Sequence, residues 1–75
     1  MKQIIYAGQY EFEGLYRQPS FCELTILQTP DRVLVVAKEL ANNPGTSITN
    51  AYPQLAEQIV ETFELNPSTT FWLEN

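Results

Sequence analysis

The stretch NPGTSITNAYPQLAEQIVETF, residues 43–63, decides the fold class of this 75-residue chain. Large apolar side chains recur in it at steps of three and four, the spacing that places them on one face of an α-helix. These side chains are Ile48, Tyr52, Leu55, Ile59 and Phe63. Turn-forming residues at 42–45 precede the pattern and indicate a loop that leads into the helix. We therefore predict one amphipathic helix whose apolar stripe lies on a sheet.

Pro53 leaves two alternatives for the beginning of this helix. If Ser47 is the N-cap, the proline ring meets the Thr49 carbonyl and removes a hydrogen bond, at a cost on the order of 3 kcal/mol. If Asn50 is the N-cap, Pro53 lies in the first turn, where its missing N–H matters little. We expect a helical turn near Ser47, then a bend, and a regular helix over residues 52–64.

The aromatic-rich residues 2–16 alternate apolar and polar side chains, which predicts an extended segment. Gly8 interrupts the alternation and marks a bulge or a bend, and Gly14 marks a second break. Residues 17–20 are expected to form a loop, because proline restricts the residue before it and has no N–H to donate.

Residues 21–28 and 33–38 each alternate as a strand does, and a Thr-Pro-Asp-Arg sequence suited to a type I turn joins them. Two strands joined by so short a turn pair antiparallel. Residues 69–73 predict a last strand, whose direction beside the hairpin is left open. The hairpin side chains expected to face the helix are Leu24, Ile26, Val33 and Val35.

Together these elements predict a single α+β domain over residues 1–75. Its sheet is expected to be antiparallel with three to four strands, and one helix packs on one face. The elements follow in the order strand, β-hairpin, helix and strand. A chain this small buries a modest fraction of its surface, so efficient packing or self-association has to hold the fold.

The charge balance argues against two classes of partner. Nine acidic residues oppose four scattered bases, which gives a net charge of −5. Nucleic-acid binding needs clustered Lys and Arg, and an anionic membrane surface would repel the chain for the same reason. The first apolar run is too short for a signal peptide, and no stretch approaches the roughly 20 apolar residues of a membrane span. We expect a cytoplasmic protein that binds a protein partner or itself, without nucleic-acid or membrane binding.

Metal and thiol chemistry lack the residues they need. The chain has no histidine and a single cysteine, Cys22, so it offers neither an internal disulfide nor a zinc ligand set. Cys22 lies in an alternating strand with no base to form a thiolate, which favours a buried core cysteine over a nucleophile. We expect no catalytic residue, no metal and no cofactor.

The helix start is a candidate anion site formed by Gly45, Thr46 and Ser47. Free N–H groups and the helix dipole would favour an anion there, but the phosphate-loop pattern is absent, and plain helix capping is the alternative. Carboxylates on one side of the helix are interpreted as a solvated face, with an acidic docking surface as the alternative. They are Glu57, Glu61 and Glu64.

Aromatic side chains of the first segment are the strongest functional candidate in the sequence. Tyrosine and phenylalanine are enriched at protein interfaces, although a small core also needs large side chains. The candidate interface residues are Tyr6, Tyr10, Phe12 and Tyr16.

The sequence Asn-Pro-Gly-Thr-Ser-Ile-Thr-Asn at 43–50, the helix after it and Phe-Trp-Leu-Glu at 71–74 resemble a group of short bacterial proteins. In that group a similar turn precedes a helix and a closing strand with a tryptophan. The likeness covers roughly the second half of the chain. It implies a bacterial, cytoplasmic, self-contained domain, and it implies no catalytic or binding residue, because the group carries no established activity.

Three functional hypotheses follow from these patterns. The first is a non-enzymatic protein-interaction module, with a homodimer as one form, because the chain is small, aromatic-rich and acidic and because edge strands offer backbone pairing. The second is a binder of a small anionic ligand, or an enzyme, that uses the helix start at residues 45–47. The third is an acidic inhibitor that mimics the charge of nucleic acid.

Overall fold

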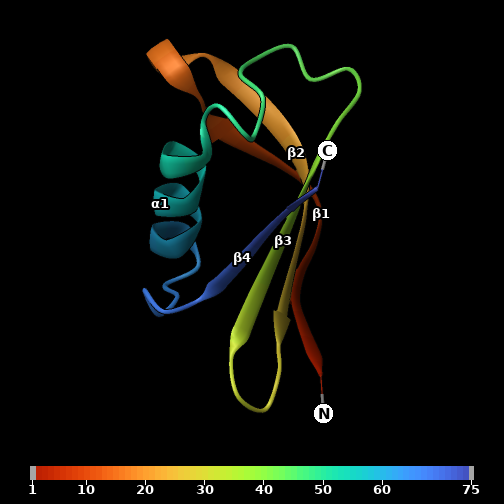
Figure 1. Ribbon diagram of the computed structural model, residues 1–75. Helices are drawn as coiled ribbons and strands as arrows, with labels where there is room; N and C mark the ends of the chain where they lie inside the picture. Colours follow the sequence, from red (N-terminus) through yellow and green to blue (C-terminus); the bar gives the residue numbers. More distant parts are fainter. Residues whose placement is uncertain (1, 75) are drawn as a thin grey trace.

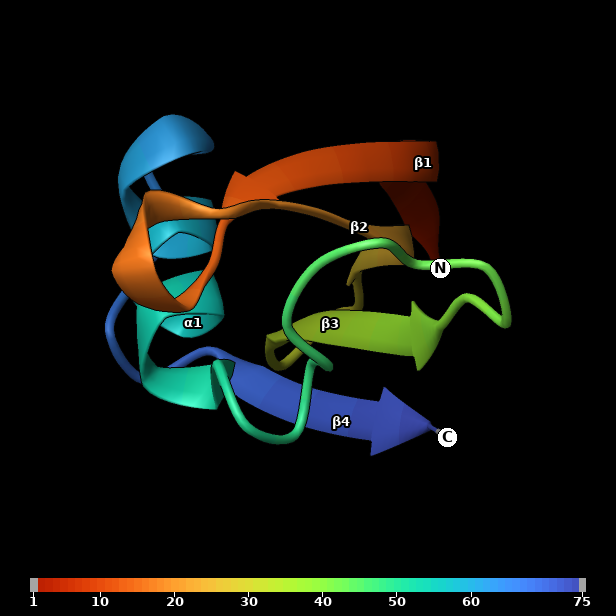
Figure 2. The same cartoon turned by 90° about the horizontal axis from the view of Figure 1, so that it is seen from above.

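The computed structural model describes residues 2–74 and folds them into one four-stranded sheet with one α-helix on one side (Figure 1). The strands lie side by side in chain order (Figure 2). They are β1 (Gln3–Glu13), β2 (Pro19–Gln28), β3 (Val33–Glu39) and β4 (Thr70–Glu74). The helix α1 spans Tyr52–Thr62, and a short 3-10 helix, η1, spans Leu15–Arg17 between β1 and β2.

The α+β fold predicted from the sequence is confirmed, with elements in the expected order. β1 pairs antiparallel with β2, and β2 pairs antiparallel with β3 through the predicted hairpin. β4 runs parallel to β3, which the sequence left open. The parallel direction follows from the chain path, because α1 carries the chain back across the sheet before β4 begins.

The N-terminal half differs from the prediction in two places. β1 continues through Gly8, at φ +150°, and the irregularity in its pairing lies between Ile4 and Tyr6. β1 ends before Gly14 as expected, but the predicted loop over 17–20 is too long, since β2 already begins at Pro19. Proline is tolerated there because the first residue of a strand can do without a ladder donor.

Pro53 lies in the first turn of the helix, as the second alternative expected, but neither Ser47 nor Asn50 is the N-cap. Ala51 is the N-cap, which puts Pro53 in the first turn, and the Ala51 N–H donates to the Ser47 carbonyl at 3.0 Å to form the preceding helical turn. α1 ends at Thr62, two residues before the predicted end. Glu64 adopts φ +55° beyond it, and the Leu65 N–H donates back into the last turn of the helix, as in a Schellman cap.

The core lies between α1 and the facing side of the sheet. Leu55 and Ile59 on the helix are at most 1% exposed, and Cys22 is fully buried, as predicted. Burying each large side chain is worth roughly 2 kcal/mol before the entropy cost. The buried apolar residues are Phe12, Cys22, Leu24, Ile26, Val35, Ala37, Ile48, Ala51, Leu55 and Ile59. The inward hairpin face is therefore the predicted one, with Val33 partly buried beside it.

Candidate functional site

The loop between β3 and α1 is held by the side chain of Asn43. Its Nδ2 donates to Glu39 Oε2 at 3.0 Å and to the Thr46 carbonyl at 2.9 Å. Its Oδ1 accepts from the N–H of Phe21 at 3.0 Å and from the N–H of Gly45 at 3.1 Å. All four hydrogen-bonding positions of the amide are used. Asn43 thus ties the loop to β2 and to the end of β3.

Donors around the predicted anion site already have acceptors inside the protein. Besides the N–H of Gly45, which Asn43 accepts, the N–H of Thr46 donates to Ser20 Oγ at 2.9 Å. The N–H of Ile48 donates to Glu39 Oε1 at 2.7 Å, so a carboxylate of the chain itself sits in this loop. α1 begins only at Tyr52, beyond the three residues of the site. Gly45, Thr46 and Ser47 therefore lie before the helix, away from the first turn where its dipole would favour an anion.

Two glycines allow this loop to approach the beginning of β2. A Cβ on Gly45 would collide with the Pro19 carbonyl oxygen and with Ser20 Oγ. A Cβ on Gly14 would stand 2.6 Å from Ser20 Oγ and 2.8 Å from Thr46 Oγ1. Ser20 is fully buried at this crossing. The conspicuous Asn-Pro-Gly-Thr-Ser sequence thus builds a packed junction.

The four aromatic residues predicted as an interface do not gather on one surface. Phe12 is in the core, while Tyr6 and Tyr10 are half-buried against Phe63, with ring centroids 5.3 and 6.0 Å apart. The Tyr10 hydroxyl also donates to Thr62 Oγ1 at 3.4 Å. Tyr16 stands apart in η1 and is 99% exposed. Phe12, Tyr6 and Tyr10 therefore contribute to packing inside the domain.

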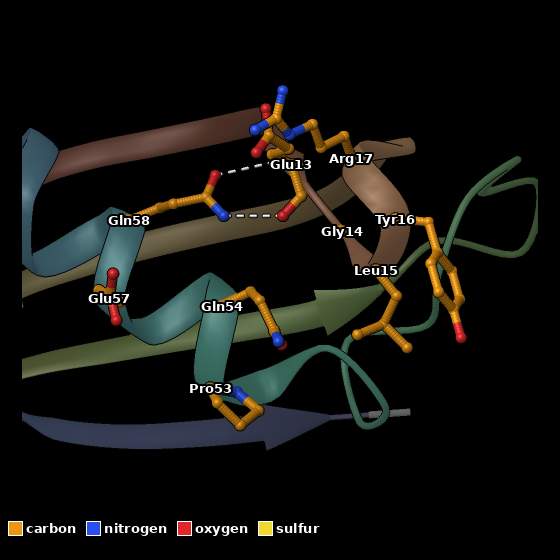
Figure 3. A pocket seen from close by; sticks show the side chains of 9 residues that line it. All are labelled: Glu13, Gly14, Leu15, Tyr16, Arg17, Pro53, Gln54, Glu57 and Gln58. Carbon is orange, nitrogen blue, oxygen red and sulfur yellow. Dashed lines mark hydrogen bonds between the residues drawn. The ribbon is translucent and has the colours of Figure 1, made fainter.

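A cavity of about 600 Å³ lies between η1 and α1 (Figure 3). At one side of the cavity Gln58 connects α1 to β1. Its Nε2 donates to the Glu13 carbonyl at 2.7 Å, and its Oε1 accepts from the Glu13 N–H at 2.8 Å. Tyr16 and Arg17 both have positive φ angles, 57° and 60°, and the Tyr16 ring points away from the cavity (Figure 3). No buried polar side-chain atom among the described residues lacks a partner. The polar side chains of the lining that carry no hydrogen bond within residues 2–74 are therefore exposed ones, such as Arg17, Gln54 and Glu57.

The sheet face opposite α1 carries several exposed or partly exposed apolar side chains. Leu27, Leu34 and Val36 lie on it, in register across β2 and β3, and stay partly exposed. Ile4 pairs with Leu27 and is 64% exposed, and Trp72 pairs with Val36 and is 60% exposed. Within residues 2–74 the one α-helix lies on the other side of the sheet (Figure 1). We refer to Ile4, Leu27, Leu34, Val36 and Trp72 as the open face.

One charged row borders the open face. Glu23 on β2 pairs with Lys38 on β3, which in turn pairs with Glu74 on β4. All three side chains are exposed and point to the same side as the open face, since each lies an even number of residues from an open-face position in its strand. An apolar centre with a charged border is the arrangement typical of a protein interface.

Sequence reasoning overlooked the open face, although one signal for it was present. The strand residues 33–37 read VLVVA, with no polar side chain to mark a solvent side. Strands that are buried on both faces have such continuous apolar runs. The inward residues Val33 and Val35 received a role in the prediction, while their outward neighbours Leu34 and Val36 received none.

A second hollow, of about 480 Å³, runs between α1 and β4. Its floor contains Tyr52 and Phe71, whose rings meet edge to face with centroids 6.0 Å apart. Ala56 and Val60 line the helix side of the hollow, together with Glu57 and Glu61. Pro67 and Thr69 line the side that leads into β4. We refer to this hollow as the β4 groove.

Two titratable groups of residues 2–74, Cys22 and Asp31, have pKa values that depart clearly from their ordinary values. Burial, and after it the charge of Glu39, raises the pKa of the Cys22 thiol to about 11, which keeps it protonated. Hydrogen bonds from Thr29 and Arg32 hold the pKa of Asp31 below its ordinary value in the exposed hairpin turn. Acids are spread over the turn, the helix and the sheet. The carboxylates of Glu57 and Glu61 lie on α1, while Glu64 lies beyond its end.

Within residues 2–74 no group of three or more acidic or cysteine side chains is placed to hold a metal ion. The one α-helix of that range is too short to span a membrane. Comparisons with protein-family models, curated proteins and solved structures gave no match. The surfaces of the chain are therefore the basis on which a function can be proposed.

Proposed function

We propose that the protein is a non-enzymatic interaction module that pairs with a second copy of itself through the open face. The observation that carries this proposal is the apolar open face on a sheet that has a helix on its other side only. In such an arrangement two sheets pack face to face, about 10 Å apart, and their outward side chains form a shared core. The resulting dimer would have four layers, with the two helices outermost.

The size of the open side of the sheet is compatible with a stable pair. A strand residue covers about 3.3 by 4.8 Å of a sheet face, so the four strands present roughly 500 Å² in projection. The accessible area of rough side chains exceeds their projection, and stable interfaces bury about 800 Å² per partner. Trp72 contributes most, since burying its exposed part, roughly 100–150 Å², is worth about 3 kcal/mol per copy.

The charges that border the open face are compatible with a second copy as the occupant. The chain carries a net charge of −5, so two copies repel each other wherever acidic surfaces meet. The open face itself holds no charged side chain. A two-fold axis brings the same patch of both copies together, which allows Lys38 of each copy to approach Glu23 or Glu74 of the other. Each copy brings one lysine and two glutamates to this border, so opposite charges can pair across the axis.

Two further statements belong to this proposal. We infer a cytoplasmic location, supported by a lone buried thiol that has no disulfide partner in the chain. We also infer that the protein acts by binding and not by catalysis, supported by the protonated thiol and by the absence of histidine.

Sedimentation equilibrium of the full chain tests the pairing. We expect a concentration-dependent dimer, and a blue shift of tryptophan emission as it forms, because Trp72 is the single tryptophan of the chain. Val36→Lys places a charge at the centre of the open face and should leave a folded monomer. Tyr16→Asn is the matched control, since it removes an exposed aromatic ring elsewhere and tolerates positive φ. A wild-type monomer at every concentration, or a Val36→Lys dimer of unchanged affinity, would refute the proposal.

A further inference from the structure

We propose that the free edge of β4, together with the β4 groove, binds an extended peptide segment of another protein that carries an apolar side chain flanked by lysine or arginine. This surface lies on the helix side of the sheet, so it is distinct from the open face. The peptide would add to the sheet as a fifth strand beside β4.

The first support is the difference between the two edge strands of the sheet. β1 has the features that protect edges from unwanted pairing, namely a register irregularity near Ile4, the positive φ of Gly8 and the exposed charges of Glu11 and Glu13. β4 has none of them before its last residue, since it reads TFWLE without proline, lysine or a bulge. In the sheet of residues 2–74, β4 has a strand neighbour only on the β3 side.

The second support is the groove that runs along this unprotected edge. A strand that pairs with β4 points every second side chain toward the helix layer. There it meets the β4 groove, where Tyr52, Val60 and Phe71 offer an apolar floor. Backbone pairing supplies affinity in such strand addition, and the pockets for alternate side chains supply specificity. The groove is thus placed where an added strand needs a side-chain pocket.

Charge determines the kind of peptide that fits. The groove lining contains two acids, Glu57 and Glu61, and none of the four basic residues of the chain. A lysine or arginine two residues from the apolar side chain lies on the same side of the added strand and can reach these carboxylates. An acidic peptide is disfavoured by the same carboxylates and by the net charge of −5.

A synthetic peptide of sequence Thr-Thr-Lys-Thr-Phe-Thr-Lys-Thr-Thr is the probe, titrated into the isotopically labelled full chain and followed by amide chemical shifts. We expect saturable shifts at Thr70–Glu74 and in the groove, and slower hydrogen exchange of the outward amides of β4. A peptide with both lysines replaced by glutamate should not bind. A peptide with the threonines beside phenylalanine replaced by proline should lose binding, because it cannot donate to the edge.

Two matched variants separate groove binding from general attraction to an acidic protein. Glu61→Lys, in the groove lining, should weaken the lysine peptide by roughly fivefold, since exposed ion pairs each contribute modestly. Glu64→Lys makes the same charge change beyond the end of α1, outside the lining, and should have a smaller effect. Equal effects of the two variants would overturn the proposal, as would binding that leaves the β4 amides unperturbed. In the Val36→Lys variant, which should not pair through the open face, protection of these amides that grows with protein concentration alone would show a second copy at this edge and would overturn it too.

Discussion

Replacing Asn43 with alanine should destabilise the protein strongly, because this side chain holds the loop before α1. The substitution removes four hydrogen bonds and leaves the N–H groups of Phe21 and Gly45 without their acceptor. It also takes one donor from the carboxylate of Glu39. A neutral hydrogen bond contributes about 1 kcal/mol and one to a charged group about 1.5–3 kcal/mol, while water can replace part of them in a half-buried loop. We expect a net loss of about 3 kcal/mol.

Such a loss is a large share of the free energy of unfolding of a domain of this size. Stability of about 0.05–0.15 kcal/mol per residue gives roughly 4–11 kcal/mol for the whole chain. In a small domain each 1 kcal/mol shifts the melting temperature by about 4–8 °C, so the midpoint should fall by roughly 12–24 °C. Urea unfolding, followed by circular dichroism at a concentration where wild type and variant are both monomeric, gives the difference without a contribution from pairing.

Asn42→Ala is the control, because the neighbouring residue is the same amide in the same loop but is exposed. Its effect should stay within the about 0.5 kcal/mol of an ordinary surface substitution. Asn43→Asp retains an oxygen for Phe21 and Gly45 but places a carboxylate against Glu39, so its deficit should shrink as the pH is lowered. If Asn43→Ala and Asn42→Ala unfold at the same urea concentration, the loop is not held as we describe.

Three further outcomes follow from the same region. Gly45→Ala should cost about 1–3 kcal/mol in urea unfolding, because the Pro19 carbonyl has to move, and an unchanged midpoint would contradict the close approach. Folding raises the pKa of Cys22 from 9.0 to about 11, so its contribution to stability is complete below pH 9 and is lost as pH rises toward 11. Cys22→Ala should therefore make the free energy of unfolding depend less on pH between 9 and 11. Equal pH dependence of the free energy of unfolding in wild type and variant would contradict this. The thiol should react with a disulfide reagent only as fast as the protein unfolds, and rapid labelling of the native state would show that Cys22 is not buried.

The helix and the hairpin could be predicted because their signals are local. Leu55 and Ile59 belong to one helical stripe whatever the rest of the chain does, and the turn before Val33 defines the pairing of β2 with β3. The position of Pro53 in the first helical turn also follows from proline's missing donor. These features depend on neighbours within a few residues, and the confirmed parts of the prediction are of this kind.

Roles decided by distant partners could not be predicted from the sequence. Alternation places Tyr6 and Tyr10 on one side of a strand, but their burial depends on Phe63, more than fifty residues away. The residues predicted to form an anion site serve instead in a junction that Ser20 completes from β2, 26 residues away, together with Asn43 of the same loop. A pattern of turn residues looks the same whether its donors face a ligand or another part of the chain.

The position of β4 in the sheet indicates which part of the open side a second copy should cover. All-parallel sheets occur almost only with both faces covered, and β3 and β4 form the one parallel pair of the described strands. Val36 and Trp72 are outward apolar residues of this pair, whereas β1 presents the polar Gln9 and Glu11 to the same side. The missing layer is therefore expected to be centred over β3 and β4 and to leave residues 9–11 of β1 uncovered. On dimer formation, hydrogen exchange should therefore slow for the amides around Val36 and stay unchanged for the amides around Glu11. Equal slowing over the whole sheet would contradict this asymmetry.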